Sequence, residues 1–207
     1  MELNKFHRYI NLDCRPDRDT LCKDQLSQIG IDSPKRFSAY ETTDGIIGCG
    51  MSHLTILKMA KDNNYPYILV CEDDVVFCSP EILKNKIAVL QNDEWDMLLL
   101  GGNIDCFVAP IHHSGDAFRI HKCFTTTAYI IREHYYDTLI ECWETALKKL
   151  VKDKKNTNYF LDVAWFPLQQ RDTWLLVKPL QVHQRAGYSN IEKRHTDYKD
   201  LMLSTKH

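Results

Sequence analysis

Residues 67–77 read Tyr67-Ile68-Leu69-Val70-Cys71-Glu72-Asp73-Asp74-Val75-Val76-Phe77: an apolar run, three acids, and a second apolar run. A continuous apolar run is typical of a strand buried on both faces of a parallel sheet. Three carboxylates directly after such a strand repel one another and are partly desolvated, so they require a cation or strong donors as compensation. Oxygen ligands at a strand end suit Mg²⁺ or Mn²⁺. The triplet therefore predicts a metal site, with a solvated acidic turn as the alternative.

Strand and helix patterns alternate outward from this stretch. Helical spacing predicts a further helix that begins at Ser52, after a glycine-rich turn that contains Gly45, Gly48 and Gly50. Residues 103–122 show no regular pattern. Alternation of this kind predicts an α/β sheet whose ligands gather at the carboxyl ends of the strands. The predicted strands are 9–12, 36–40, 66–71, 95–100, 123–131 and 174–177, and the other predicted helices are 17–29, 80–90 and 133–151.

The chain of 207 residues is long enough for one domain with a sizeable core. Its 26 Lys and Arg nearly balance 28 Asp and Glu, so it lacks the basic field that a nucleic-acid backbone attracts, and we expect no nucleic-acid partner. The apolar runs are far shorter than the roughly 20 residues of a membrane helix. The amino terminus has no apolar signal-peptide core. We therefore expect a cytoplasmic protein with no transmembrane segment.

Eight cysteines include no Cys-x-x-Cys pair, and several lie inside apolar runs, which is typical of buried, reduced thiols. His112, His113 and His121 lack a compact ligand spacing and indicate loop residues rather than a zinc site. Neither cysteine nor histidine spacing therefore predicts a structural metal.

A charged segment follows the first predicted strand and contains Asn11, Asp13, Arg15 and Arg18. Guanidinium groups there could pair with a diphosphate, while an amide or carboxylate could hydrogen-bond a base or ribose. In Gly48-Cys49-Gly50-Met51-Ser52-His53, small residues run into a predicted helix start, where backbone N–H groups can approach an anion or sugar. The glycine patterns of P-loop ATPases and dinucleotide dehydrogenases are absent, which argues against both classes.

Taken together and in order, these motifs resemble glycosyltransferase family 25, which includes lipooligosaccharide sugar transferases and the collagen galactosyltransferase domain. The resemblance continues through Ala128-Tyr129-Ile130-Ile131, Asp162 and the segment Pro179-Leu180-Gln181-Val182-His183-Gln184, so it covers roughly residues 8–192. The segments that mainly carry the resemblance are Ile10-Asn11-Leu12-Asp13 with Arg15 and Arg18, Arg36-Phe37-Ser38-Ala39, residues 48–53, and Ile68-Leu69-Val70-Cys71-Glu72-Asp73-Asp74-Val75.

The resemblance implies a single GT-A-type, Rossmann-like domain over residues 1–207, with a mixed, mostly parallel sheet flanked by helices. Its nucleotide-sugar half would span about 1–105 and its acceptor-side half about 106–192, with a polar tail at 193–207. The implied activity is metal-dependent transfer of a hexose from a UDP-sugar, with inversion, to a hydroxyl of a saccharide or a hydroxylysine-like side chain. Gly50 and Cys71 depart mildly from the family pattern. These motifs do not specify which sugar is transferred, the acceptor, or the oligomeric state, and they leave retention of the anomeric configuration open as the alternative to inversion.

The resemblance also implies a role for each site residue. The triplet would be the counterpart of the family's DxD-type motif, with Glu72, Asp74 and His183 as ligands of Mn²⁺ or Mg²⁺. Asp162 would be the catalytic base, because a carboxylate among apolar residues has a raised pKa, although it could instead cap a helix; His183 could equally be a surface histidine. The donor-binding residues would be Asn11 on the nucleoside, Arg15 and Arg18 on the phosphates, Asp73 on the ribose or sugar, and Asp13, Ser52 and His53.

Two alternatives of other classes remain open. A catalytically silent nucleotide-sugar or glycan-binding module would keep the fold without turnover, but it would have no reason to retain both the acidic triplet and Asp162. A nucleotidyltransferase would need a glycine-rich, basic triphosphate loop near the amino terminus, and the sequence has none.

Overall fold

The computed structural model describes residues 1–107 and 115–204, with a central sheet of eight strands. The strands are β1 (His7–Asn11), β2 (Arg36–Ser38), β3 (Tyr67–Glu72), β5 (Met97–Leu99), β6 (Asn103–Phe107), β7 (Ala117–Phe124), β8 (Ala128–Arg132) and β9 (Trp174–Val177). They lie in the order β2-β1-β3-β8-β5-β9-β7-β6. Strands β7 and β8 are antiparallel to both neighbours, so the other six share one direction. The predicted mixed, mostly parallel sheet is confirmed.

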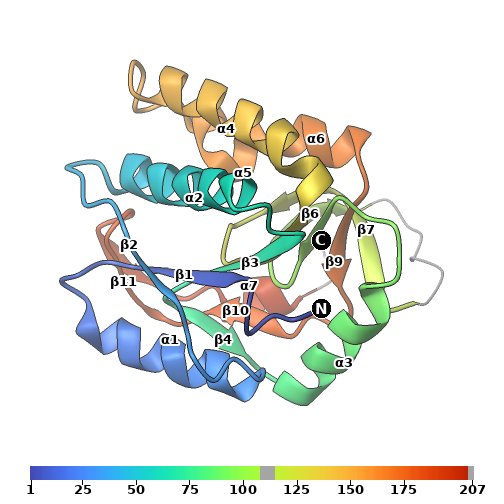
Figure 1. Cartoon of the computed structure of the whole chain (residues 1–207). Coiled ribbons are helices and arrows are strands. Elements are labelled where there is room, and N and C mark those ends of the chain that lie inside the picture. The colour runs from blue at the N-terminus through green and yellow to red at the C-terminus, as the bar shows by residue number, and fades with distance from the viewer. Residues whose placement is uncertain (108–114, 205–207) are drawn as a thin grey trace.

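Helices cover both faces of the sheet. On one face lie α2 (Gly45–Asp62), α4 (Tyr136–Leu150), α5 (Leu161–Ala164) and α6 (Phe166–Arg171), and on the other lie α1 (Pro16–Gln28) and α3 (Pro80–Leu90) (Figure 1). Short 3-10 turns occupy Glu133–Tyr135 and Thr157–Tyr159, and α7 (Lys199–Leu203) follows near the carboxyl terminus. Each face of the sheet has its own apolar core. The fold is therefore a three-layer α/β sandwich, as the sequence predicts.

Strand β3 lies inside the sheet, between β1 and β8, and its middle residues are buried on both faces. Ile68 and Val70 face one core, Leu69 and Cys71 face the other, and none of the four is more than 1% exposed. Each fully buried aliphatic side chain contributes about 1.5–3 kcal/mol of hydrophobic free energy. The strand direction and register that place Glu72 at its end are therefore strongly stabilised.

A carboxyl-terminal segment returns to the end of β3. Strand β4 (Val75–Phe77) pairs with β10 (Val182–Gln184), and β11 (Gly187–Ser189) pairs with β12 (Arg194–Thr196) in a hairpin. The backbone N–H of Arg185 donates to the Asp74 carbonyl at 2.6 Å. This pairing brings residues 184–191 over the acidic triplet.

The prediction of a glycine-rich turn before Ser52 is wrong, because α2 already begins at Gly45. A Cβ atom at Gly48 would overlap the carbonyl oxygen of Tyr40, and one at Gly50 would lie 2.6 Å from Leu147 Cδ2. The glycines thus permit close packing inside a helix. Ser52 lies mid-helix, where its hydroxyl donates to the Gly48 carbonyl at 2.7 Å and accepts the Tyr40 N–H at 2.9 Å. Residues 48–53 therefore offer no helix-start N–H groups to an anion.

The region from 103 to 131 also differs from expectation. Residues expected to be irregular form β6 and most of β7, and the single strand expected at 123–131 is two strands with a break at 125–127. Strands β6 and β7 lie at one edge of the sheet, and the burial of β7 is incomplete, so residues 103–124 lack a continuous apolar signal. His121 lies on β7, while His112 and His113 fall outside the described residues.

The other expectations agree closely with the structure. The helices expected at 17–29, 80–90 and 133–151 and the strand at 174–177 are present, with ends that differ by a few residues at most. Within the described part of the chain, no helix combines the length and apolarity needed to cross a bilayer. The cysteines whose side chains are described are free thiols: Cys14, Cys22, Cys49, Cys71, Cys78, Cys123 and Cys142.

We expect Gly48→Ala to destabilise the protein by about 1–3 kcal/mol, because the new methyl group displaces the backbone at Tyr40. Alanine is favoured over glycine inside a helix by about 1 kcal/mol, so propensity alone would give the opposite sign. Urea unfolding measures the difference. Gly187→Ala is the matched control, because its Cβ meets no atom within 4 Å and should change stability little. Stabilisation by Gly48→Ala would show that close packing does not explain this glycine.

Candidate functional site

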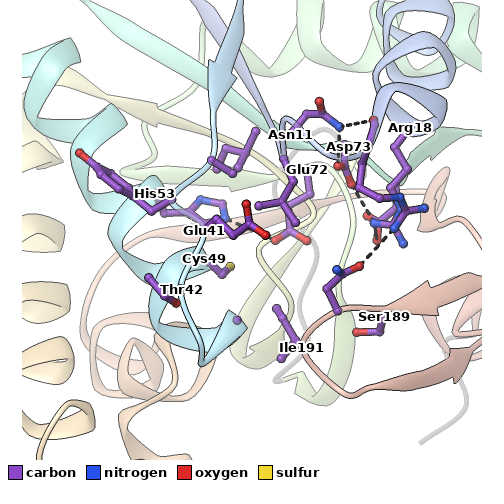
Figure 2. Close-up of a pocket in the computed structure, with 18 of the residues that line it drawn as sticks. Asn11, Arg18, Glu41, Thr42, Cys49, His53, Glu72, Asp73, Ser189 and Ile191 are labelled. Carbon is purple, nitrogen blue, oxygen red and sulfur yellow. Dashed lines mark hydrogen bonds and ion pairs between the residues drawn. The ribbon is translucent and has the colours of Figure 1, made fainter.

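Two adjoining cavities lie at the edge of the sheet where the parallel strands β1 and β3 end. The first has a volume of about 220 Å³ and is drawn in Figure 2, and the second has a volume of about 440 Å³. The residues that line both are Cys49, Glu72, Asp74, Gln184, Ser189 and Ile191. Two of the three predicted acids therefore form the wall between the cavities.

Arg18 compensates the charge of two acids. Its Nη1 donates to Asp73 Oδ1 at 2.8 Å and lies 3.3 Å from Asp74 Oδ2, and its Nη2 donates to the Tyr188 carbonyl at 3.0 Å. A guanidinium group shared by two partly buried carboxylates supplies the donors that the sequence pattern requires. Arg18 also ties helix α1 to the carboxyl-terminal hairpin.

Asn11, at the end of β1, is 2% exposed and engages both of its amide N–H groups. One donates to Asp73 Oδ2 at 2.8 Å and the other to the Arg15 carbonyl at 3.0 Å, while its oxygen accepts from Arg36 Nε at 2.9 Å. Asn11 therefore holds Asp73 in place (Figure 2). Arg15 lines the first cavity and lies beside Asp17 and Asn190.

Thr126 and His53 are the neighbours of the Glu72 carboxylate. Its Oε1 accepts the Thr126 hydroxyl at 2.5 Å and lies 3.4 Å from Nε2 of His53, a contact that does not meet hydrogen-bond geometry. Burial acts to raise the pKa of Glu72, but the His53 ring and the Thr126 hydroxyl outweigh burial and lower this pKa. Glu72 is therefore charged at neutral pH.

The surroundings of Asp74 shift its pKa in the opposite direction from that of Glu72. Burial and the nearby Glu72 carboxylate raise the pKa of Asp74 to about 7, despite the opposing effect of Arg18. Its Oδ1 atom is buried and has no hydrogen-bond partner among the described residues. A buried, unpartnered carboxylate oxygen beside a charged carboxylate has the chemistry of a hard-cation ligand. Glu72 and Asp74 thus fit a divalent cation.

Asp162 lies in the first turn of α5 and lines the second cavity. Burial raises the pKa of its carboxyl, and Glu72 adds to the effect. Its Oδ2 accepts the backbone N–H of Thr125 at 3.1 Å, and no side-chain cap is present at the start of α5. The helix-cap alternative is therefore not what the structure shows. Thr125 has φ = 75°, a conformation that β-branched residues rarely adopt.

Three predicted site residues lie outside both cavities. Asp13 is exposed and pairs with Arg36 and Ser38. Ser52 is buried inside α2, as described above. His183 is 8% exposed and contacts the carbonyl of Gln184 through Nδ1. Neighbouring residues of a strand face opposite sides, so Gln184 lines both cavities and His183 does not.

Other cavity residues were not predicted from the sequence. The loop at residues 39–43 lines the first cavity, Thr125 and Thr126 line the second, and Gln184, Ser189 and Ile191 line both. The cavities thus draw on both expected halves of the chain. Only Gln184 had a usable signal, because it lies in the family-like segment Pro179-Leu180-Gln181-Val182-His183-Gln184. The others lie in loops or, for Ser189, at the end of the short strand β11, where no apolar periodicity marks them.

A model of glycosyltransferase family 25, described as an LPS biosynthesis protein, matches residues 19–161. No curated protein matches the chain. Among solved structures, mannose-1-phosphate geranyltransferase from Thermus thermophilus is similar, with a TM-score of 0.51 and 10% identity over 83% of this chain and 73% of that one. A197 from STIV is similar with a TM-score of 0.50 and 10% identity, over 98% and 95% of the two chains. At this identity the structures support the GT-A-type fold alone.

We expect Asp74→Asn to stabilise the metal-free protein at pH 8 by more than about 1.4 kcal/mol, the equivalent of one pKa unit. Because the pKa of Asp74 is raised to about 7, the folded state binds a proton more tightly than the unfolded state. Native stability from this group is therefore lost as the pH rises from about 4 through 7. The advantage of the variant should shrink toward pH 4. Urea unfolding in a chelator at several pH values measures it.

Asp73→Asn is the matched control, because both oxygens of Asp73 accept hydrogen bonds, from Asn11 and Arg18. We expect that variant to be destabilised at pH 8. If Asp74→Asn were also destabilised at pH 8, the charge on Asp74 would be compensated within the protein, and the case for a cation ligand would fail.

Proposed function

This chain belongs to glycosyltransferase family 25, and we propose that it transfers a hexose from a UDP-sugar to a hydroxyl of a saccharide or a hydroxylated side chain, with Mn²⁺ or Mg²⁺. The observation that carries the proposal is that the carboxylates Glu72 and Asp74 each line both cavities and so lie between them. Donor and acceptor would meet at these carboxylates. The first cavity would take the donor and the second the acceptor.

Residues of the first cavity suit a nucleoside diphosphate. Arg15 and Arg18 supply guanidinium groups, and the loop at 39–43 together with Ile191 offers a mixed surface for the nucleoside. Glu72 and Asp74 would hold the divalent cation, which would neutralise the negative charge of the departing diphosphate. Arg18 would then give up its contact with the Asp74 carboxylate and pair with a phosphate oxygen of the donor. Asn11 acts as a positioning residue, because it holds Asp73.

Asp162 has the surroundings of a general base at the second cavity. A raised carboxyl pKa makes it a stronger proton acceptor than an exposed carboxylate. The acceptor hydroxyl would lose its proton to Asp162 while its oxygen forms a bond to the anomeric carbon and the bond from that carbon to the diphosphate breaks. His183 has no part in this proposal, because it lines neither cavity.

We predict that Asp74→Ala lowers transfer at least a hundredfold while the fold is retained. The substitution removes a cation ligand, and the diphosphate then departs without several kcal/mol of electrostatic help. Release of UDP from UDP-glucose, UDP-galactose and UDP-N-acetylglucosamine with Mn²⁺ measures the loss. Asp137→Ala is the control, since Asp137 is exposed on α4 and pairs with Lys61. If Asp74→Ala kept more than about a tenth of the turnover, a loss of only about 1.4 kcal/mol, the cation assignment would be wrong.

We predict that Asp162→Asn separates binding from chemistry. Asparagine can still accept the Thr125 N–H, but it cannot take a proton at neutral pH. Donor affinity by calorimetry should be nearly unchanged with Mn²⁺, transfer should fall about a hundredfold or more, and the acidic limb of the pH–rate profile should disappear. Loss of donor affinity would make Asp162 a donor contact instead. If the wild-type chain bound a UDP-sugar but showed no turnover, the protein would instead be the catalytically silent nucleotide-sugar-binding module.

A further inference from the structure

A second set of metal-ligating groups adjoins the acidic triplet. The Cys49 thiol, a His53 ring nitrogen and the Glu72 carboxylate lie within 4.8 Å of one another, and Figure 2 shows their side chains as neighbours. Cys49 and His53 are four residues apart on α2, so the helix presents them on one face. Glu72 reaches them from the end of β3.

His53 is 0% exposed, and its Nε2 atom has no hydrogen-bond partner among the described residues. Its Nδ1 atom lies 2.9 Å from the Tyr129 hydroxyl. When an ion displaces any proton from Nε2 and Nδ1 donates its own to Tyr129, Nε2 presents a lone pair toward Glu72 and Cys49. Metal-ligating histidines commonly use their second nitrogen in this way, which fixes the tautomer. The buried, unpartnered nitrogen is thus a second observation that points to a ligand.

We propose that Cys49, His53 and Glu72 form a binding site for a thiophilic divalent ion of the Zn²⁺ class. Thiolate, imidazole and carboxylate together are a zinc-type donor set, whereas Mg²⁺ and Mn²⁺ prefer oxygen ligands. Zinc bonds are about 2.0–2.3 Å long. The 3.4 Å between His53 Nε2 and Glu72 Oε1 already suits two ligands of one ion, and Cys49 needs a small side-chain adjustment.

The site is accessible and keeps one position open. Cys49 and Glu72 line both cavities, so an ion can enter and retain a water as fourth ligand on the cavity side. Binding breaks the S–H bond of Cys49, forms the sulfur–metal bond and releases the proton to solvent. Because Glu72 belongs to both sets, a thiophilic ion competes with the cation of the donor site. This last consequence alone rests on the proposed function.

Cobalt(II) tests the site directly, because a thiolate bound to Co²⁺ gives a charge-transfer absorption band in the near ultraviolet. The full-length chain is titrated with Co²⁺ under conditions that keep thiols reduced and without any nucleotide. We expect the band in the native protein and its loss in Cys49→Ser. Cys142→Ser is the matched control, since Cys142 is also a partly buried thiol on a helix, and it should retain the band. Absence of the band, or its survival in Cys49→Ser, would overturn the proposal.

A measurement on the native chain covers the case in which Cys49→Ser does not fold. Alkylation by iodoacetamide, mapped by mass spectrometry, should slow at least tenfold at Cys49 when Zn²⁺ is added, with no change at the exposed Cys14. Equal alkylation of Cys49 with and without Zn²⁺ would also overturn the site. Neither experiment involves sugar transfer, so their failure is distinct from failure of the proposed function.

Discussion

Repulsion among three carboxylates at the end of one buried strand is the constraint on which the site depends. Strand β3 is buried on both faces, so its carboxyl end cannot move to relieve the repulsion among Glu72, Asp73 and Asp74. The protein compensates with groups from distant segments: Arg18 from α1 and Asn11 from β1. These contacts hold helix α1 and strand β1 against Asp73, directly after the end of β3.

The compensation is incomplete at one atom. Asp73 and Glu72 have donors, whereas Asp74 keeps a buried oxygen without a partner among the described residues and a pKa raised to about 7. Evolution toward stability alone would replace such a carboxylate, because a neutral side chain there avoids a buried charge. The proposed cation-binding role would explain why the residue is an acid, and the proposed group transfer would need charge stabilisation at the position of Asp74 between the two cavities.

Much of the fold and the central residues of the site could be predicted from the sequence. Apolar periodicity marks β3, α3 and α4, because their burial is dictated by side chains a few residues apart. The acids were found because three charges next to a buried strand are costly wherever the chain goes. Asp13 and Ser52 illustrate the limit of motif reasoning: each stands in a family-like segment, but the first turns to solvent and the second supports the backbone of Tyr40.

By itself, the sequence determined the α/β class, the buried strand and the acid cluster at its end, since these follow from local pattern and from the cost of desolvating charge. Only the tertiary structure decided which groups surround that cluster. It brought residues 184–191 over the acids through the pairing of β4 with β10, and it turned Gln184 rather than His183 into the cavities. It also placed Cys49 and His53 beside Glu72. Such contacts join residues far apart in the chain, and a change of one residue in the pairing of β10 with β4 would turn the opposite side chains toward the cavities.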